Sequence, residues 1–493
     1  MSKVTRWIAL SVACTVVVGV AATAATARST SIPSATTPLT APLATGVYDS
    51  LFTSSQQSQA FAMSSAAGAT YARIDTTWKT IAPSTLPSSD WTLADQANPN
   101  SPYYHWGALD ATVEAAEANG IKPILDILGT PSWAYHVQPS GVGGGQPDVN
   151  MLGAFAKALA LRYNGSGPAP AVHAYSTYNE VNFNRNFSPQ DPTYYRYMVN
   201  AVADSVHAVD SSNLALAGEL APYKHASSKK DKNNVIAPIT WMQKMLCVSS
   251  TSPAQRTCAA GSTHFDVWTH HPYSDKGPFG KASVAGGVEL GDLPKMNSLL
   301  KTAYGLGAIT TESGQAPQFW VTEIGWSSNP PNKHGVGLKL LTRWTSESLW
   351  QVWKSGATLG TWFLLQDKPL TTPFQSGLYF LSPSLDNAVA KSTLPAFQFP
   401  FVAYHKSGGK VAMWGRDPHS DAQTVTIQRK SGSSWKTVGT ITTNSYGIFQ
   451  ATMSLHSLTT WQLRATTQGM NSAPFSLTVP SNENMNVTPF PLN

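Results

Sequence analysis

A regular alternation of short apolar segments with amphipathic ones constrains the fold of this chain most, and it extends from Gly46 to about Ser407. Short segments rich in β-branched and aromatic residues are typical of buried strands, whereas apolar residues three and four positions apart indicate helices. We expect eight strands, at residues 45–49, 70–75, 121–127, 172–178, 214–219, 265–270, 318–322 and 358–364. Helical patterns separate them, for instance at residues 106–118, 151–162, 294–304 and 338–354.

This order of elements favours a (β/α)₈ barrel, in which eight parallel strands, each followed by a helix, close into a cylinder. Such barrels occupy from about 200 to more than about 400 residues, and the alternating region falls within that range. An open doubly wound sheet is the alternative. A nucleotide-binding sheet of that kind would carry a glycine-rich phosphate loop after its first strand, and none follows residues 45–49.

The pattern changes after Ser407-Gly408-Gly409, where apolar and polar residues begin to alternate with a period of two. Turn-forming residues separate these short segments, as they do in small β-sandwiches. We therefore expect a barrel domain at 44–407, an immunoglobulin-like β-sandwich at 408–480 and a polar tail at 481–493. The sandwich could bind a glycan, pack against the barrel or hold it away from a surface.

The first 27 residues are typical of a secretory signal peptide. Lys3 and Arg6 precede an apolar stretch at 7–20, and Ala25-Thr26-Ala27 fits the small-residue site at which a signal is cleaved. A membrane anchor is the alternative, but the apolar stretch is short for a bilayer span. Residues 28–43, rich in Ser, Thr and Pro, are expected to form a linker. We expect a secreted, extracellular protein, free or attached to the cell surface, with no membrane span after cleavage.

Charged residues make up only 12% of the chain and aromatic residues 10%, which excludes a disordered protein and suits one that handles neutral polar ligands. Removal of residues 1–27 takes away Lys3 and Arg6 and no acid, so the formal net charge falls from +6 to +4. No basic run is long enough to indicate nucleic acid as a partner. We expect a monomer.

Two cysteines, Cys247 and Cys258, remain once the signal peptide has removed Cys14. Two cysteines close together in an exported protein favour a disulfide, whereas a metal site would need further ligands. His270 and His271 could form half of a metal site, but adjacent histidines lack the spacing of ligands on a helix or strand. We therefore expect a Cys247–Cys258 disulfide, no metal and no cofactor.

Carboxylates follow two of the predicted strands. Asn179 and Glu180 stand directly after the fourth strand, and Glu323 follows the seventh. The carboxyl ends of the strands of a (β/α)₈ barrel face one funnel, so we expect the two glutamates to converge there. Glycoside hydrolysis needs such a pair, one carboxyl to protonate the leaving oxygen and the other to attack the anomeric carbon. The alternative is a structural carboxylate paired with Arg73, and Glu219, which ends the fifth strand, is the best substitute carboxylate.

The sequence around both glutamates resembles the retaining glycoside hydrolases of clan A. Tyr-Asn-Glu-Val-Asn-Phe at 178–183 is similar to their Asn-Glu strand, and Phe-Trp-Val-Thr-Glu-Ile-Gly-Trp at 319–326 to their nucleophile strand. The nearest members are family 39, the β-xylosidase-like enzymes, and then family 5. The resemblance covers about residues 44–405 and implies Glu180 as acid/base, Glu323 as nucleophile and Asn179 as donor to the sugar 2-hydroxyl. Val181 departs from the family pattern, in which Pro usually follows Asn-Glu.

The resemblance also assigns roles to residues after other strands. Arg73 is similar to the clan's arginine that favours the ionised nucleophile. His-His-Pro-Tyr at 270–273 is similar to a motif in which His271 lines the sugar site and Tyr273 orients the nucleophile. Trp362, at the end of the eighth strand, would be an aromatic platform under the sugar. Core packing is the alternative for Trp362, because side chains fill the interior of such barrels.

Together these residues predict a secreted retaining glycosidase that cleaves O-glycosidic bonds, most often β-linked, by double displacement. The substrate would be a glycoside, an oligosaccharide or a polysaccharide, and the sequence leaves the sugar, the linkage and exo or endo action open. An inactive carbohydrate-binding or cell-surface protein on the same barrel is the alternative. Loss of either glutamate would favour that alternative, and both Glu180 and Glu323 are present.

Overall fold

A computed structural model describes residues 41–88, 90–223, 234–259, 261–419, 422–455 and 461–480. The predicted signal peptide, nearly all of the predicted linker and the predicted tail lie outside these ranges.

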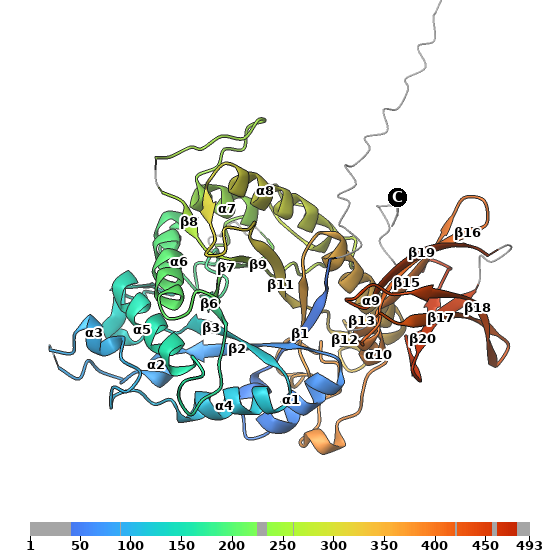
Figure 1. The fold of residues 1–493 in the computed structure, drawn as a ribbon, viewed down its shortest axis with the longest axis horizontal. Coiled ribbons are helices and arrows are strands. Elements are labelled where there is room, and N and C mark those ends of the chain that lie inside the picture. The colour runs from blue at the N-terminus through green and yellow to red at the C-terminus, as the bar shows by residue number, and fades with distance from the viewer. Residues whose placement is uncertain are drawn as a thin grey trace, which may run out of the picture. The chain divides into compact units, whose positions relative to one another are not determined.

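Eight parallel strands form a closed barrel (Figure 1), which confirms the predicted (β/α)₈ fold. The strands follow one another around the barrel in chain order, and the last pairs with the first. They are β1 (Ala44–Tyr48), β2 (Tyr71–Thr77), β3 (Lys122–Leu128), β6 (Ala174–Thr177), β7 (Leu214–Leu220), β9 (Val267–His270), β11 (Gln318–Ile324) and β14 (Leu359–Phe363). Each predicted strand overlaps one of these eight.

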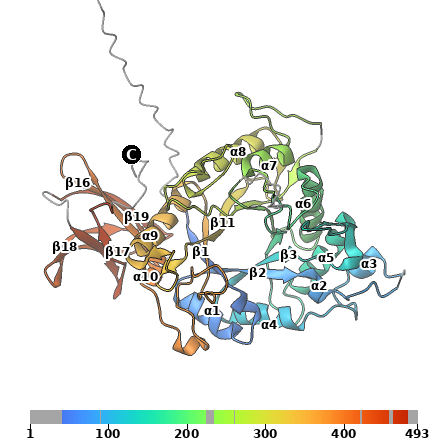
Figure 2. The same cartoon turned by 180° about the vertical axis from the view of Figure 1, so that it is seen from behind.

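Helices connect the strands and lie around the outside of the barrel (Figures 1 and 2). The long helices are α1 (Gln57–Ala66), α4 (Gly107–Ala118), α5 (Val149–Arg162), α6 (Pro192–His207), α7 (Pro238–Leu246), α8 (Leu293–Gly305) and α9 (Leu338–Lys354). Shorter ones are α2 (Trp78–Ile81), α3 (Leu93–Gln96) and α10 (Thr393–Gln398). Asp148 and Asp191 begin α5 and α6, because each side chain accepts hydrogen bonds from two amides of the first turn.

Small elements occupy the loops between the strands and helices. Three pairs of short strands are β4 (Tyr135–Val137) with β5 (Gln146–Pro147), β8 (Thr263–His264) with β10 (Ile309–Thr310), and β12 (Ser328–Asn329) with β13 (Val336–Gly337). Short 3₁₀ helices are η1 (Ser50–Thr53), η2 (Ser132–Ala134), η3 (Leu290–Asp292) and η4 (Leu385–Asn387).

The interior of the barrel is apolar toward the amino ends of its strands. Six buried side chains from six different strands pack together there: Ile124, Ala174, Leu216, Val267, Trp320 and Leu359. The strands are also buried on their outer face, where they contact the helices. Apolar side chains thus occupy the amino-terminal half of the interior. The polar side chains of the predicted site lie at the other end, where the strands end.

Antiparallel sheets follow the barrel, as the period of two predicts. One contains β15 (Phe401–Lys406), β16 (Lys410–Arg416) and β19 (Ile448–Ser454). The other contains β17 (Thr424–Ser431), β18 (Ser434–Thr442), β20 (Gln462–Thr467), β21 (Met470–Asn471) and β22 (Phe475–Ser476). The first of these strands, β15, precedes Gly408, and the domain boundaries themselves stay a prediction.

Helix α9 contacts these sheets through a buried charged pair. The guanidinium of Arg343 lies 4.0 Å from the ring centre of Phe475 on β22, and its Nη1 donates to the carbonyl of Ser476 at 2.7 Å. Glu347, one turn further along α9, pairs with Arg343 at 2.9 Å and accepts a hydrogen bond from the Tyr404 hydroxyl at 2.6 Å. The sheets therefore supply the partners that two buried charges of a barrel helix need.

Cys247 and Cys258 form a disulfide, as predicted, with their Cα atoms 5.5 Å apart. Nη1 of Arg196 on α6 lies 3.0 Å from Sγ of Cys247, so the linked loop is attached to the helix layer. Among the residues that the structure describes, no helix is both long enough and apolar enough to cross a membrane.

Candidate active site

Arg73 lies at the centre of a buried cluster of polar side chains at the carboxyl ends of the barrel strands. It belongs to β2 and is 1% exposed. Its Nη1 donates to Oε1 of Glu323 at 3.0 Å, and its Nη2 donates to Oδ2 of Asp126 at 2.5 Å and to Oδ1 of Asn179 at 2.9 Å. Its Nε lies 3.5 Å from Oε2 of Glu219. Because a guanidinium presents its donors in fixed directions, Arg73 holds these four side chains in one arrangement.

Glu323 is the last residue but one of β11, and both oxygens of its carboxylate are held. Oε1 accepts the hydrogen bond from Arg73, and Oε2 accepts one from the hydroxyl of Tyr273 at 2.7 Å. Burial raises the pKa of Glu323 above its usual value, although the positive charges of His271 and Arg73 oppose this, and the charge of Glu180 adds to it. The two hydrogen bonds fix the direction of the carboxylate.

Glu180 enters the cluster from the turn after β6 and is more open than Glu323. Its side chain is 21% exposed, against 9% for Glu323. The turn is strained, because Tyr178 and Glu180 have φ values of 63° and 47°, which bulky residues rarely adopt. The amide of Tyr178 donates to the carbonyl of Ile127, and that of Glu180 donates to the carbonyl of Glu219. Neighbouring strands thus hold the strained turn, an arrangement typical of functional sites.

The imidazole of His271 stands between three carboxylates. Its Nε2 lies 2.5 Å from Oε2 of Glu219, and its Nδ1 lies 3.3 Å from Oε1 of Glu180 and 3.8 Å from Oε2 of Glu323. Burial alone would lower the pKa of His271, but the charge of Glu323 and the contacts with Glu180 and Glu219 raise it to about 10. A protonated His271 donates from both ring nitrogens, toward Glu219 on one side and the two predicted catalytic glutamates on the other.

The adjacent His270 has a different environment. Its Nε2 lies 2.9 Å from the carbonyl oxygen of Val288, and burial lowers the pKa of His270 to about 3. Successive side chains of a strand point to opposite faces, so only His271 of this pair belongs to the cluster.

Glu219 has a larger part in the cluster than its sequence position indicates. It is fully buried, Oε1 accepts a hydrogen bond from Ser176 at 3.1 Å, and Oε2 accepts one from Thr322 at 2.8 Å. Burial would raise the pKa of Glu219, but the charge of Arg73 and the hydrogen bonds from His271 and Thr322 lower it to about 2. Together with Glu323 and Glu180, Glu219 therefore favours the protonated form of His271.

A bulge in β7 turns Glu219 into the cluster. The register between β7 and β9 shifts between Ala217 and Leu220. Gly218 has a φ of 116°, and a Cβ at this position would lie 2.2 Å from the carbonyl oxygen of Thr269, so that only glycine fits. A Gly-Glu pair at the end of an apolar strand is the signal that points to this role, although the strand pattern alone predicts Glu219 only as a substitute carboxylate.

Two aspartates on adjacent strands belong to the cluster and are not among the predicted site residues. Asp75 on β2 and Asp126 on β3 are register partners. Asp126 is fully buried, and burial raises its pKa to about 8, with the charge of Glu219 adding to the effect and Arg73 opposing it. Asp75 accepts a hydrogen bond from the Tyr48 hydroxyl at 2.8 Å. Carboxylates at equal positions of two neighbouring strand ends are the signal that could have indicated them.

Trp362 lies apart from the other predicted site residues. It is 1% exposed, its Nε1 donates to the carbonyl of Ser376 at 2.7 Å, and its ring lies 6.2 Å from that of Trp326. Leu359 points into the barrel, so Trp362, three residues later on the same strand, points toward the outer layer. This enclosed position agrees with core packing, the alternative for Trp362.

Phe363, the next residue, is the aromatic side chain of β14 that lies beside the cluster. Its ring stacks on that of Tyr48 at 5.1 Å and meets the edge of Tyr273 at 6.0 Å. The guanidinium of Arg73 lies 5.2 Å from the centre of the Tyr48 ring. Phe363 and Tyr48 therefore form an aromatic surface next to the residues that hold Glu323.

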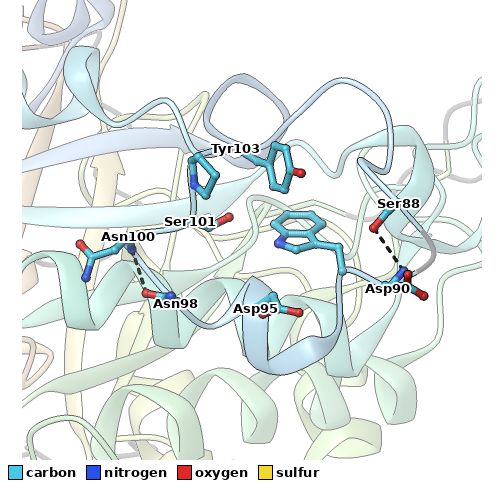
Figure 3. A pocket seen from close by; sticks show the side chains of 9 residues that line it. Ser88, Asp90, Asp95, Asn98, Asn100, Ser101 and Tyr103 are labelled. Atoms are coloured by element: carbon cyan, nitrogen blue, oxygen red, sulfur yellow. Dashed lines mark hydrogen bonds between the residues drawn. The ribbon is translucent and has the colours of Figure 1, made fainter.

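A pocket of about 200 Å³ adjoins Tyr273. Its lining residues are Tyr223, Tyr273, Ser274, Asp275, Gly325, Trp326, Ser327, Phe374 and Ser376. A second pocket, of about 290 Å³, lies around Trp91 in the loops that flank α3 and includes Asp90, Asp95 and Tyr103 (Figure 3). None of its lining residues belongs to the carboxylate cluster.

No protein-family model matches the sequence, and a search among curated proteins finds no match. The structure is similar to that of a family 39 glycoside hydrolase from the gut symbiont Bacteroides cellulosilyticus WH2, with a TM-score of 0.50 and 14% identity over 84% of this chain and 81% of that chain. The two chains share a fold.

Two further solved structures are similar. One is a monomeric β-xylosidase from Caulobacter crescentus CB15, with a TM-score of 0.47 and 14% identity over 84% of this chain and 95% of that chain. The other is a family 30 endoxylanase from Clostridium papyrosolvens C71, with a TM-score of 0.41 and 12% identity over 85% of this chain and 96% of that chain.

Proposed function

We propose that this chain is a secreted retaining glycoside hydrolase in which Glu323 is the nucleophile and Glu180 the acid/base. The observation that carries the proposal is the convergence of both carboxylates on Nδ1 of His271, which lies 3.3 Å from Glu180 and 3.8 Å from Glu323. The two glutamate oxygens are therefore separated by no more than the sum of these distances. A separation of about 5–5.5 Å between the two carboxyl groups, as in retaining glycosidases, lies below this upper limit.

The unequal surroundings of the two glutamates support this division of roles. Arg73 and Tyr273 each donate a hydrogen bond to one oxygen of Glu323, which favours its ionised form and fixes the direction from which it attacks. Glu180 is the more exposed of the two, so a leaving group and then a water molecule can reach it. A nucleophile needs a fixed direction, and an acid/base needs access.

The reaction would take two steps. In the first, an oxygen of Glu323 attacks the anomeric carbon, the bond to the leaving oxygen breaks, and the proton of Glu180 passes to that oxygen. In the second, Glu180 takes a proton from water, the water oxygen attacks the anomeric carbon, and the ester bond to Glu323 breaks. The sugar leaves with its original anomeric configuration, and both carboxyl groups return to their starting states.

Asn179 would bind the sugar 2-hydroxyl. Its Oδ1 accepts a hydrogen bond from Nη2 of Arg73 at 2.9 Å, so the amide group is oriented and its Nδ2 points the other way as a donor. A donor next to Glu180 and on the same guanidinium as Glu323 suits a group that must hold the sugar between them.

The substrate class follows from the same site. Neutral sugars present apolar C–H faces and hydroxyl groups, and the aromatic pair of Tyr48 and Phe363 beside polar donors suits both. We propose a β-linked glycoside or oligosaccharide, handled outside the cell after removal of the signal peptide. An inactive carbohydrate-binding protein is the second candidate, but it leaves the two hydrogen bonds that orient Glu323 without a purpose.

A panel of 4-nitrophenyl glycosides that differ in sugar and anomer tests the proposal on the full chain. We expect hydrolysis of at least one of them, with retention of configuration in the first-formed sugar by proton NMR. Glu323→Gln should lower the rate by several orders of magnitude, because no glycosyl-enzyme can form. Glu114→Gln, an exposed glutamate of α4, is the matched control and should leave the rate unchanged. Inversion of configuration, or full activity of Glu323→Gln, would contradict the proposal.

A further inference from the structure

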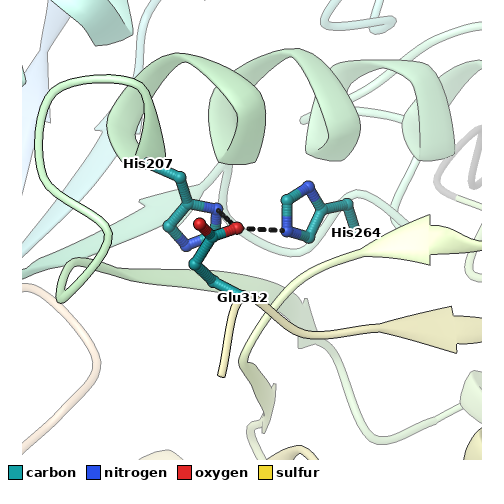
Figure 4. A group of neighbouring side chains, drawn as sticks. All are labelled: His207, His264 and Glu312. Carbon is teal, nitrogen blue, oxygen red and sulfur yellow. Dashed lines mark ion pairs between the residues drawn. The ribbon is translucent and has the colours of Figure 1, made fainter. Parts of the chain in front are cut away.

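Three side chains of kinds that bind metal ions lie together (Figure 4). They lie near the amino ends of barrel strands β9 and β11, whereas the carboxylate cluster lies at the carboxyl ends. His207 is the last residue of α6, His264 belongs to β8, which precedes barrel strand β9, and Glu312 follows β10. Oε2 of Glu312 lies 3.7 Å from Nδ1 of His207 and 3.5 Å from Nε2 of His264. The three ligand atoms all lie within 4.8 Å of one another.

The other nitrogen of each imidazole is held by an aspartate. Nε2 of His207 lies 2.8 Å from Oδ2 of Asp266, and Nδ1 of His264 lies 2.8 Å from Oδ1 of Asp204. An imidazole that donates one N–H to a carboxylate presents its second nitrogen as a lone pair, and metal-binding histidines are held in this way almost without exception. The remaining nitrogen of each ring here faces the same oxygen of Glu312.

The backbone fixes the aspartate behind His207. Oδ2 of Asp266 accepts a hydrogen bond from the amide of Ala215 at 2.8 Å, and Oδ1 accepts one from the amide of Glu312 at 3.0 Å. Asp266 therefore orients His207 through its side chain and Glu312 through the main chain. Two of the three ligand residues are positioned by one carboxylate.

The buried Nδ1 atom of His207 gives independent support for a ligand at this position. Its side chain is 4% exposed, and within the part of the chain that the structure describes its Nδ1 makes no hydrogen bond. Buried polar atoms in proteins are nearly always hydrogen-bonded, so an atom that is not calls for an explanation. Nδ1 is the atom that points toward Glu312 and His264 (Figure 4).

We propose that His207, His264 and Glu312 bind a divalent transition metal ion, with Zn²⁺ the best match. Two imidazole nitrogens and one carboxylate oxygen are a common Zn²⁺ ligand set, and tetrahedral Zn²⁺ places its ligand atoms about 3.3 Å apart. Two of the three separations here are already 3.5 and 3.7 Å. Because His264 is 21% and Glu312 35% exposed, these two side chains can close on the ion, and water can take the fourth position.

The position of the site points to a structural role. The ion would join the carboxyl end of α6 to the segments that lead into barrel strands β9 and β11. The amino-terminal face of such barrels serves stability rather than catalysis. No local spacing in the sequence indicates the site, because its ligands come from three segments far apart in the chain. The cysteines and His270-His271, from which the sequence predicts no metal, do not belong to it.

Calorimetric titration of the untagged, EDTA-treated full chain with Zn²⁺ tests the proposal. We expect one ion per chain, and with Co²⁺ the visible absorption of a tetrahedral centre. His264→Asn and Glu312→Gln, both at partly exposed positions, should weaken Zn²⁺ binding at least tenfold. Asp204→Ala should weaken it about 10–100-fold, because it removes the carboxylate that holds His264. His105→Asn, at an exposed histidine elsewhere, is the matched control and should change nothing.

Two results would overturn the metal site. One is a wild-type chain that shows no measurable Zn²⁺ binding, which would leave only the contacts between the two histidines and Glu312. The other is binding that survives in the double variant His264→Asn/Glu312→Gln, which would place the ion elsewhere. Circular dichroism shows whether each variant is folded, and a rise in melting temperature on adding Zn²⁺ should occur in the wild type and be lost in Glu312→Gln.

Discussion

Glu180 and Glu219 have the same positive φ and are joined by a main-chain hydrogen bond. Both have a φ of 47°, and the amide of Glu180 donates to the carbonyl oxygen of Glu219 at 2.7 Å. A non-glycine residue in this region costs roughly 1–3 kcal/mol, so two in contact represent strain that the barrel must hold. The result is that two carboxylates from adjacent strands lie on either side of the His271 ring.

Glu180→Ala should separate substrates by their leaving groups. Substrates with a poor leaving group need the proton of Glu180 and should lose about 10²–10⁴-fold in rate, whereas those with an acidic phenol should keep their first step. The glycosyl-enzyme should then accumulate, and added azide, which needs no general base, should restore turnover as a glycosyl azide of retained configuration. The measurements are steady-state rates for both substrate types and product analysis by NMR. Equal losses for both types without azide rescue would assign the acid to another residue, with Glu219 first to test.

Glu219→Gln should lower the stability and shift the pH profile of the reaction. Removing one partner of a buried charged pair costs about 3–5 kcal/mol, which urea unfolding measures. Without the Glu219 charge the pKa of His271 falls. The fall of kcat/KM on the alkaline side of its pH profile should therefore begin at a lower pH. Thr322→Val is the matched control, because it removes a hydrogen bond to Glu219 but keeps the charge, and its profile should stay in place. A profile of Glu219→Gln that matches the wild type would limit Glu219 to a structural role.

The stability of the protein should depend on pH through His271. Because its folded-state pKa is raised from 6.5 to about 10, the protonated ring stabilises the fold fully below about pH 6.5, and this contribution is lost as the pH rises through about 10. Asp126, with its pKa raised to about 8, contributes with the same sign but loses its effect between about pH 4 and 8. Melting temperatures of the wild type and His271→Asn should therefore converge as the pH rises from about 6.5 to about 10. A constant difference over this interval would show that His271 is not charged in the folded protein.

Phe475→Ala should lower the stability without changing catalysis. Phe475 is buried, lies against the guanidinium of Arg343 and meets the ring of Tyr404 at 5.3 Å. Replacement of a buried phenylalanine by alanine typically costs about 3–5 kcal/mol, so the melting temperature should fall. At temperatures where the variant is folded, kcat/KM should equal that of the wild type. A reduced kcat/KM in the folded variant would instead indicate that the antiparallel sheets complete the substrate site.

The eight strands and their closure into a barrel follow from the sequence because buried strands need continuous apolar segments. The convergence of Glu180 and Glu323 follows in turn, since both stand at carboxyl ends. The role of Glu219 does not follow in this way. It depends on a one-residue bulge at Gly218, where the close approach of the Thr269 carbonyl oxygen leaves room only for glycine. A bulge changes the face of the sheet on which the next side chain lies.

The face on which a strand residue lies, and its partner on the next strand, are also hard to predict, because both depend on the exact register of the strands. The face of Trp362 depends on Leu359 lying inside the barrel, and a shift of one position would exchange the places of Trp362 and Phe363. The pairing of Asp75 with Asp126 is a matter of register between two strands. The group of His207, His264 and Glu312 depends on how a helix end and two loops meet, which no local pattern encodes.

Apolar side chains fill the amino-terminal half of the barrel, and this limits how the leaving group, water and other acceptors can reach or leave the proposed site. Within the described residues, Ile124, Ala174, Leu216, Val267, Trp320 and Leu359 fill the barrel interior at the amino ends of the strands, so the proposed site opens toward the carboxyl ends. In the proposed reaction, the aglycone would then leave on the same side of the barrel from which the water of the second step arrives. An alcohol or a second sugar on that side would meet the same proposed glycosyl-enzyme as water does. Hydrolysis and transfer of the sugar to a new acceptor would therefore compete, because water and the acceptor would reach the intermediate from the same side.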